Sequence, residues 1–277
     1  MKLSIESNPD IPLGKTSEYP QSYDPDLLFP IPRLGKRLEL GIDQNQLPFF
    51  GVDIWNAWEV SWLNLKGKPC VAIGQIHFPA ESEFLVESKS LKLYFNSLNQ
   101  HRLSSVDALE KLVAADLTHA VGVPVVVTMS HPDRYENCQA PMGQCIDELD
   151  VEIDNYSYQP ELLKLLEDGE VRHQLLYSHL LKSNCLVTGQ PDWGSVWIEY
   201  SGQEIDQEAL LKYLISFRNH NEFHEQCVER IFTDIKRFCN PQRLTVWARY
   251  VRRGGLDINP YRSNCQREFV FERDFRQ

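Results

Sequence analysis

Residues 55–78 read WNAWEVSWLNLKGKPCVAIGQIHF, and this stretch decides the fold of the first half of the chain. Residues 55–66 and 69–78 are rich in β-branched and aromatic residues, and between them stands Lys66-Gly67-Lys68. Two such runs separated by a short turn that contains glycine are typical of a β-hairpin. The sequence therefore predicts two antiparallel strands here.

Two helices are predicted directly after this hairpin. Residues 88–100 and 105–120 repeat apolar residues at helical spacing, and Ser105 is a suitable N-cap for the second helix. The apolar positions are Leu91, Tyr94, Phe95 and Leu98 in the first helix, and Ala108, Leu109, Leu112, Val113 and Leu117 in the second. Residues 123–129 are expected to form a buried strand, and residues 145–156 another strand.

The second half of the chain repeats this order of elements. Its predicted elements are strands at 178–187, 195–200, 244–251 and 268–271, and helices at 206–219 and 221–239. The turn Pro191-Asp192-Trp193-Gly194 is expected to join the first two strands, and Asn221 to cap the second helix. Both halves then have a β-β-α-α-β-β order.

The two halves also share a weak likeness in sequence. The segment 94–99, YFNSLN, lies 119 positions before the segment 213–218, YLISFR, and each ends a first helix. A repeat longer than a hundred residues indicates tandem domains rather than a solenoid. The sequence therefore predicts an α+β fold with domains at 51–160 and 161–277. A single unrepeated α+β domain is the alternative.

Residues 1–50 differ from the rest in composition. They carry seven of the 16 prolines, a density that disfavours helix and central strand. We expect an extended N-terminal arm here. Its first residues have no apolar core of signal-peptide length, and no stretch of the chain is apolar enough for a membrane span.

The bulk composition limits the class of partner. Hydrophobic residues make up 42% of the 277 residues, enough for a substantial core, and the net charge of −11 disfavours binding to a phosphate backbone. The seven cysteines form an odd count without Cys-x-x-Cys spacing, which indicates reduced thiols in a cytoplasm and gives a zinc site little support. No Gly-x-Gly-x-x-Gly or P-loop motif is present.

One segment of the second half combines a thiol and an acid. Cys185 ends an apolar run in Ser183-Asn184-Cys185, and Asp192 follows seven residues later. A thiol that attacks an electrophilic carbon, beside an acid that protonates the product, makes a minimal covalent-catalysis pair. Equally, free cysteine is often a small buried hydrophobe, and an aspartate often only closes a turn.

Three further groups of residues have both a functional and a structural explanation. Residues 88–92 and 252–255 are basic clusters, SKSLK and RRGG, that suit phosphate binding at a helix start and at a glycine turn, or are simply solvated charges. His224 and Glu225 follow Asn221 at a predicted helix start. Glu225 is either a favourable charge in the first turn or an acceptor for the N–H edge of a guanine-like base.

Together these segments resemble the QueF family of NADPH-dependent 7-cyano-7-deazaguanine reductases, which are nitrile reductases of queuosine biosynthesis. The segments are ESKSLKLY at 87–94, SNC at 183–185 with DWG at 192–194, FHE at 223–225 and RRGG at 252–255. The resemblance runs from about residue 13 to residue 263. A signature motif in the first half and the cysteine in the second is the arrangement of the longer, bimodular subgroup.

The resemblance implies a fold, a reaction and a set of site residues. It implies two tandem tunnelling-fold domains, a cytoplasmic homodimer, and reduction of the nitrile by two NADPH through a thioimidate on Cys185, without a catalytic metal. Neither nucleic acid nor membrane is an expected partner. The implied catalytic residues are Cys185, Asp192 and His224, the substrate-binding residues Val86, Glu87, Ser88, His224 and Glu225, and the NADPH-binding residues Ser88, Lys89, Arg253 and Gly254.

Other functions remain open at this point. A hydrolase resembling GTP cyclohydrolase shares the expected fold, but it needs a zinc site whose ligand spacing is missing here. A cysteine-dependent nitrilase forms the same thioimidate and then adds water. A purine- or tRNA-binding module needs no thiol at Cys185. The first half has no cysteine in the equivalent segment, and Cys70 is interpreted as structural.

Overall fold

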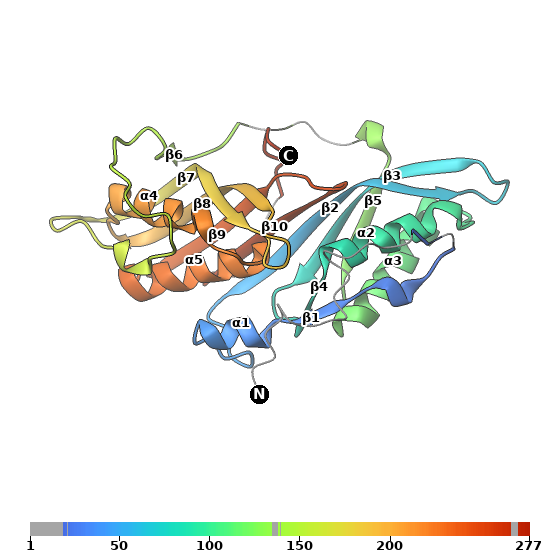
Figure 1. Cartoon of the computed structure of the whole chain (residues 1–277), viewed down its shortest axis with the longest axis horizontal. Coiled ribbons are helices and arrows are strands. Elements are labelled where there is room, and N and C mark those ends of the chain that lie inside the picture. The colour runs from blue at the N-terminus through green and yellow to red at the C-terminus, as the bar shows by residue number, and fades with distance from the viewer. Residues whose placement is uncertain (1–18, 21, 135–137, 139, 267–270) are drawn as a thin grey trace. The chain divides into compact units, whose positions relative to one another are not determined.

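The computed structural model describes residues 19–20, 22–134, 138, 140–266 and 271–277. The chain forms two compact units, whose elements are labelled in Figure 1. Unit 1 comprises Met1–Asn45, Val52–Asn137 and Arg252–Ile258, and unit 2 comprises Gln46–Gly51, Cys138–Val251 and Asn259–Gln277. Both units are therefore discontinuous in sequence, whereas the expected domains at 51–160 and 161–277 are contiguous.

Unit 1 contains the hairpin predicted from residues 55–78. Strand β2 (Phe50–Leu63) pairs antiparallel with β3 (Pro69–Pro79), and β3 pairs in turn with β5 (Val126–Ser130). Gly67 has a φ of 84° in the connecting turn, which explains the glycine there. The expected buried strand at 123–129 is wrong in part. β5 ends the sheet order, and its residues alternate between exposed and buried.

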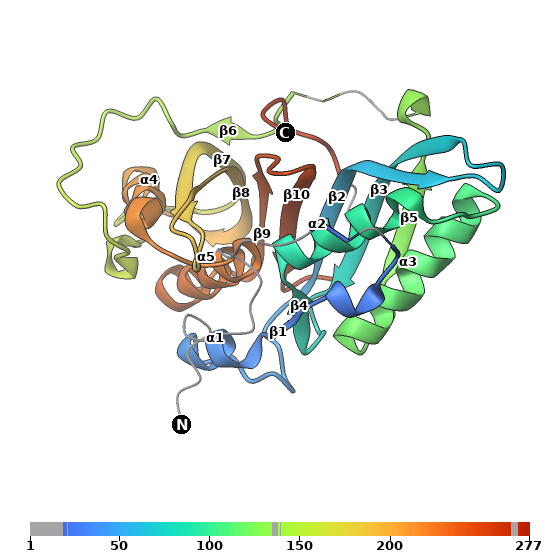
Figure 2. The same cartoon turned by 45° about the vertical axis from the view of Figure 1, so that its right-hand side comes forward.

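Both predicted helices of unit 1 are confirmed. They are α2 (Ser88–Ser97), extended by a 3₁₀ turn (Leu98–Gln100), and α3 (Val106–Val121). Ser105 caps α3, because its side chain accepts a hydrogen bond from the Ala108 N–H. Figures 1 and 2 show both helices over the same face of the β2–β3–β5 sheet, where their apolar stripes join the core.

The expected extended arm at 1–50 is wrong within the described residues. It contains a 3₁₀ turn (Pro25–Leu27), strand β1 (Pro30–Pro32) paired with β4 (Phe84–Val86), and helix α1 (Leu34–Glu39). Prolines fit here because they occupy a first helical position and a two-stranded edge. Residues 1–18 and 21 of the expected arm lie outside the described residues.

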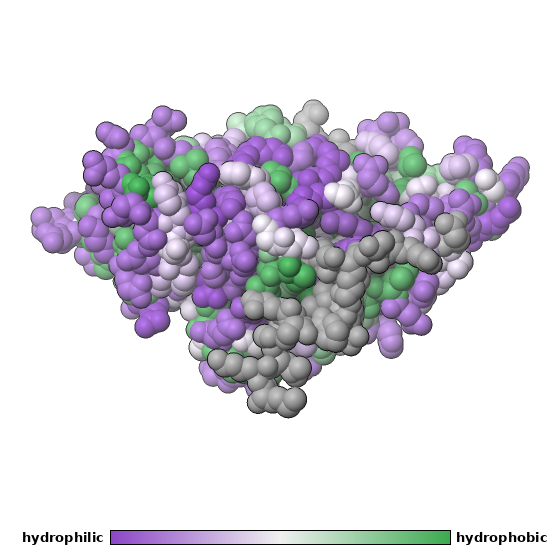
Figure 3. Space-filling model, viewed as in Figure 1, coloured by the Kyte–Doolittle hydropathy of each residue, from purple (hydrophilic) through white to green (hydrophobic). Residues whose placement is uncertain are grey.

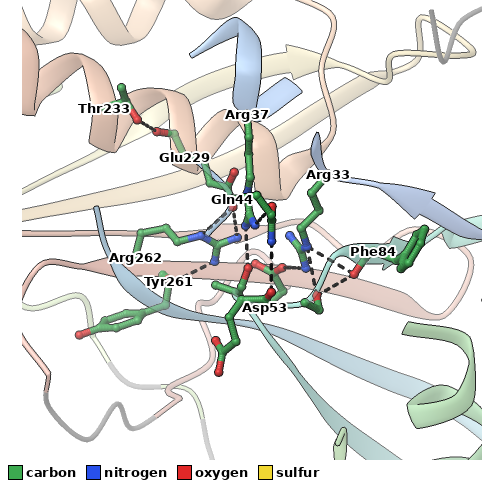
Figure 4. Close-up of polar contacts among 12 residues, drawn as sticks. Arg33, Arg37, Gln44, Asp53, Phe84, Glu229, Thr233, Tyr261 and Arg262 are labelled. Atoms are coloured by element: carbon green, nitrogen blue, oxygen red, sulfur yellow. Dashed lines mark hydrogen bonds and ion pairs between the residues drawn. The ribbon is translucent and has the colours of Figure 1, made fainter. Parts of the chain in front are cut away.

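Buried arginines hold this segment to unit 1, as Figure 4 shows. Arg33 is 2% exposed and forms an ion pair of 2.6 Å with the buried Asp53. Arg37 is fully buried, and it donates to the Ala80 carbonyl at 2.6 Å and to Gln44 at 2.7 Å. Charges buried in this way stabilise a fold only when they are paired, so these contacts fix one position for α1.

Unit 2 has the order β10-β9-β8-β7-β6 in its sheet. Its strands are β6 (Gln144–Cys145), β7 (Val171–Asn184), β8 (Pro191–Gln203), β9 (Arg243–Tyr250) and the part of β10 (Leu256–Ser263) that begins at Asn259. Its helices are α4 (Gln207–Ser216), extended by a 3₁₀ turn (Phe217–Asn219), and α5 (His224–Cys239). Neighbouring strands are antiparallel except β6, which runs parallel to β7.

Several expected boundaries in unit 2 are wrong. Residues 191–194 begin β8, and the turn is formed by residues 185–190 instead. The strand expected at 145–156 is reduced to β6, and β10 was not expected because Pro260 interrupts its pattern. Most of the strand expected at 268–271 lies outside the described residues.

The two units share a buried polar network in addition to their element order. Each has a hairpin, two helices and a following strand. In each, one aspartate of the second helix accepts hydrogen bonds from two tyrosines, at 2.6–2.8 Å. The networks are Tyr23, Tyr94 and Asp116 in unit 1, and Tyr158, Tyr213 and Asp234 in unit 2.

The surface agrees with the acidic composition. On the face shown in Figure 3, hydrophilic residues cover most of the described surface, and hydrophobic residues lie in small scattered groups.

The ends of α3 and α5 give a test of the backbone geometry. Gly122 follows α3 with a φ of 77°, and Asn240 follows α5 with a φ of 42°. Gly122→Ala should lower the free energy of unfolding by about 1 kcal/mol, because alanine is strained in this conformation. A Cβ there meets no atom within 4 Å, so no clash contributes. Urea denaturation followed by circular dichroism measures the change, with Asn240→Gly as the tolerated control. Equal losses in both variants would contradict the prediction.

Candidate active site

Cys185 directly follows β7 at the end of the β7–β8 hairpin. Its N–H donates to the Gln190 carbonyl at 2.8 Å, and its own carbonyl accepts from the Gly189 N–H at 3.0 Å. Gly189 has a φ of 66°, which allows this short loop to close. The Cys185 side chain is buried, with 7% exposed. The loop therefore holds the thiol at a fixed place with little access to water.

Asp192 lies on β8 at the same end of this hairpin. It is the cross-strand partner of Ser183, and its neighbour Pro191 pairs with Asn184, the residue before Cys185. Its carboxyl is buried, and Oδ2 lies 3.4 Å from Nε2 of His224. The hairpin register, rather than a turn at 191–194, brings the acid back toward the thiol.

The segment before α5 is joined to the end of β7. The Asn184 N–H donates to the His220 carbonyl at 2.8 Å, and its carbonyl accepts from the Glu222 N–H at 3.0 Å. The Asn184 side chain also donates to the Asn221 side chain at 3.0 Å. Asn221 was expected to be the N-cap of α5, but that position is taken by Phe223.

His224 and Glu225 are the first two residues of α5. His224 is largely buried, and its ring centroid lies 4.0 Å from that of Tyr250. Glu225 is 2% exposed. The bridge at Asn184 places the helix start beside the hairpin, so unit 2 brings Cys185, Asp192, His224 and Glu225 to one region.

Glu222, two residues before α5, forms a buried ion pair in this region. It is fully buried, and Arg230 contacts both of its carboxylate oxygens, at 2.6 and 2.8 Å. His220 Nε2 lies 3.0 Å from Oε2. Burial alone would raise the pKa of Glu222, but Arg230 and His220 lower it to about 2. Glu222 is therefore a buried anion whose charge is balanced by its neighbours.

Glu87 of unit 1 is the N-cap of α2. Its two carboxylate oxygens accept hydrogen bonds from the backbone N–H groups of Lys89 and Ser90, each at 2.8 Å. Burial raises the pKa of Glu87, although these hydrogen bonds act in the opposite direction. This capping role was not expected from the sequence. A carboxylate has about four acceptor positions, so capping leaves capacity for a ligand.

The two basic clusters meet in unit 1. Residues 253–256 form a tight turn in which Gly254 and Gly255 have φ values of 56° and 79°. A Cβ on Gly254 would lie 3.0 Å from Cε of Lys92, one turn into α2. Bare glycine backbone beside a lysine near a helix N-terminus suits the phosphates of a dinucleotide. These residues therefore fit the cofactor that the resemblance implies.

Unit 1 has a counterpart of the thiol–acid hairpin with different residues. Leu63 pairs with Pro69 as Asn184 pairs with Pro191, so Asn64 stands where unit 2 has Cys185. By the same register, Cys70 stands where unit 2 has Asp192. The Asn64 side chain closes the turn by accepting from the N–H groups of residues 66 and 68. This hairpin has an amide where the unit 2 hairpin has a thiol.

Tyr250 belongs to this region and was not expected from the sequence. Tyr250 ends β9, and only its register against Gly194 of β8 reveals that it lies beside His224.

Among the described residues, no group of three or more His, Cys, Asp or Glu side chains could hold a metal ion. All seven cysteines are free thiols. Within the described part of the chain, no helix has the length and apolar character needed to cross a membrane.

Comparison with known proteins identifies the class. A family model described as nitrile reductase, 7-cyano-7-deazaguanine-reductase N-term, matches residues 19–129, and one described as QueF-like protein matches residues 191–269. The chain is thus similar to nitrile reductases over both units.

Curated relatives give the family. The chain is 57% identical to a protein of Chromobacterium violaceum over 92% of its own length and 91% of the relative. It is 56% identical to one of Hydrogenovibrio crunogenus over 96% of both, and 58% identical to one of Ralstonia nicotianae over 91% and 92%. Each is named NADPH-dependent 7-cyano-7-deazaguanine reductase. The chain belongs to this family.

Because of the Glu222–Arg230 pair, we expect the free energy of unfolding to fall steeply as the pH is lowered, and we call this part of the pH dependence the acid limb. Because the pKa of Glu222 is lowered to about 2, its contribution is complete above the unfolded pKa near 4.5 and is lost as pH falls toward 2. That contribution is about 3 kcal/mol. Glu222→Gln should destabilise the protein at pH 7 and flatten this limb, as urea denaturation at several pH values would show. The exposed Glu170, paired with Arg172, gives a control, Glu170→Gln, that should change neither. An unchanged acid limb in Glu222→Gln would refute the assignment.

Proposed function

We propose that this protein reduces the nitrile of 7-cyano-7-deazaguanine to give 7-aminomethyl-7-deazaguanine, with NADPH as the reductant, in queuosine biosynthesis. The observation that carries the proposal is the buried Cys185 at the hairpin end that also holds Asp192 next to His224. The relatives named for this reaction support it across nearly the whole chain. Nothing among them favours a hydrolase resembling GTP cyclohydrolase.

The first step is proposed for Cys185 and Asp192. The Cys185 thiolate attacks the nitrile carbon and forms a carbon–sulfur bond, while an electron pair of the triple bond moves to nitrogen. Asp192 gives that nitrogen a proton, and the product is a covalent thioimidate. His224 is proposed to replace the proton that Asp192 gives, and the 3.4 Å between its Nε2 and the Asp192 carboxyl supports this role.

The later steps follow from the electron count. Conversion of a nitrile to a primary amine takes four electrons, so NADPH supplies a hydride in each of two reduction steps. After the first reduction the carbon–sulfur bond breaks, Cys185 is released, and the second reduction acts on the imine. The burial of Cys185 and Asp192 keeps water from the thioimidate, which a nitrilase would instead hydrolyse.

Two groups of residues are proposed to recognise the substrate. Glu225 can accept two hydrogen bonds from the N–H groups of the 2-amino-4-oxopyrimidine edge, and His224 contacts the substrate beside it. Val86, Glu87 and Ser88 have substrate-binding roles by resemblance, and these stay predictions. The capping bonds of Glu87 fix its carboxylate without using all its acceptor positions.

The cofactor is proposed to bind to Ser88, Lys89, Arg253 and Gly254. The closeness of the Gly254 backbone to the Lys92 side chain supports this, because it brings the basic turn to the start of α2. The chain has a net charge of −11, which would repel the cofactor's phosphates. The basic side chains of these two clusters offset that charge locally.

The architecture implied by the family is also a proposal. We propose tandem tunnelling-fold domains in a cytoplasmic homodimer, and the shared element order and the paired tyrosine–aspartate networks support the duplication. With an amide at Asn64, unit 1 supplies no second nucleophile at the equivalent hairpin, so we expect one thioimidate per chain.

The electron count gives the first test of function. Purified protein with 7-cyano-7-deazaguanine should consume two NADPH for each amine formed, measured by the loss of NADPH absorbance and by chromatography of the product. A reaction that proceeds without NADPH and yields an acid would indicate a nitrilase. No consumption of NADPH would remove the proposal.

The covalent step gives the second test. Incubated with substrate but without NADPH, the wild-type protein should gain one substrate mass per chain in its intact mass. Cys185→Ala should gain none, and Cys227→Ala, at another buried cysteine of unit 2, should gain as much as wild type. Asp192→Asn should form the adduct at least about 100-fold more slowly while binding substrate nearly as well, because it loses the proton donor. An adduct on Cys185→Ala would overturn the assignment of the nucleophile.

A further inference from the structure

The ring of His224 has two defined neighbours in unit 2. The Asp192 carboxyl lies 3.4 Å from Nε2, and the aromatic ring of Tyr250 lies 4.0 Å away between centroids, inclined by 45°. Tyr250 is 1% exposed, so its ring is held by packing on its other sides. An imidazole with an acid at one nitrogen and an aromatic ring beside it has few orientations left.

Gly194 makes room for the Tyr250 ring. The two residues are cross-strand partners on β8 and β9, and a Cβ on Gly194 would lie 3.1 and 3.2 Å from Cδ1 and Cε1 of that ring. The same Cβ would lie 3.3 Å from the Arg249 carbonyl. Gly194 does not have a positive φ, so it is needed for space and not for its backbone conformation. An aromatic ring packed on a cross-strand glycine is a stable arrangement in antiparallel sheets.

The backbone of Tyr250 is fixed as well. Its carbonyl accepts a hydrogen bond of 3.0 Å from Nε2 of Gln277, which also donates to Asn259 at 2.6 Å. The next residue, Val251, donates its N–H to the Trp193 carbonyl at 3.0 Å. Burial raises the pKa of the Tyr250 hydroxyl well above its ordinary value, so Tyr250 stays neutral and is no candidate for a base.

We infer that Tyr250 is a positioning residue that holds the His224 ring with Nε2 toward Asp192, and that Gly194 allows Tyr250 to lie there. A half-turn of the His224 ring would replace the nitrogen facing Asp192 by a carbon, which could not replace the proton that Asp192 gives. The inference rests on the proposed function for its effect on catalysis. The placement of the ring is independent of that function.

Kinetics test the effect on catalysis. Tyr250→Leu and Gly194→Ala should each lower kcat for NADPH oxidation by about 10-fold with little change in KM, because they loosen an aromatic contact on a proton-transfer group. Tyr250→Phe should restore most of the activity lost in Tyr250→Leu, since the ring is retained. In a His224→Ala background, Tyr250→Leu should lower kcat by no more than about twofold further. An equal loss in both backgrounds would overturn the inference.

Matched controls separate positioning from general damage to the fold. Gly202 stands near the other end of β8 from Gly194, and a Cβ on Gly202 would lie 2.9 Å from Pro241. Tyr200 is a fully buried tyrosine of the same strand. Gly202→Ala and Tyr200→Leu should lower the melting temperature at least as much as the test variants and keep kcat within about threefold of wild type. A loss of kcat in these controls equal to that in the test variants would overturn the inference.

A measurement without substrate separates this inference from the proposed function. The imidazole nitrogen signals of His224 in a nitrogen-15 spectrum are identified by their loss in His224→Ala. They should shift or broaden in Tyr250→Leu and Gly194→Ala and stay unchanged in the two control variants. Unchanged His224 signals in Tyr250→Leu would overturn the inference even if the enzyme proves active. An inactive wild-type protein with altered signals in Tyr250→Leu would instead refute only the proposed function.

Discussion

The candidate active site depends on one short backbone contact, the bridge between Asn184 and residues 220–222. Its two hydrogen bonds, of 2.8 and 3.0 Å, tie the end of β7 to the segment that begins α5. The thiol follows Asn184 on one side of this bridge, and His224 follows on the other. Glu222 belongs to this bridge and also forms a buried ion pair with Arg230. Removal of either partner of that pair would leave a buried charge and so weaken the segment that carries the bridge.

The same bridge exists in unit 1, where it supports no nucleophile. The Leu63 N–H donates to the His101 carbonyl at 2.9 Å, and the Leu63 carbonyl accepts from the Leu103 N–H at 2.9 Å. After it comes Asn64, whose side chain is used to close the turn. The bridge is therefore a property of the fold that both units share, and the residue that follows it is an asparagine in unit 1 and a cysteine in unit 2. The proposed nucleophile would thus stand on a scaffold that folds without it.

The sequence predicted the elements whose signals are local and missed those that depend on pairing. Helices α2 and α3 were recognised because apolar spacing and the Ser105 cap lie within each segment. The turn expected at 191–194 was wrong because pairing of β8 with β7 and β9 overrides the turn preference of Pro191 and Gly194. The site residues named from motifs lie within short segments that can be recognised locally. Tyr250 lies outside these segments on another strand, and its place beside His224 follows only from the register.

The start of α5 lacks a stabilising feature that other helices of the chain have. Helices α2, α3 and α4 each begin with a side chain that caps the backbone, namely Glu87, Ser105 and Asp206. Helix α5 has Phe223 at its N-cap position without such a hydrogen bond, although a suitable Asn221 stands two residues earlier. A side-chain cap is worth about 1 kcal/mol. Here Asn221 bonds to Asn184 instead and so strengthens the bridge, while His224 and Glu225 occupy the first turn. The helix loses a cap, and the hairpin gains a fixed position for the residues that face it.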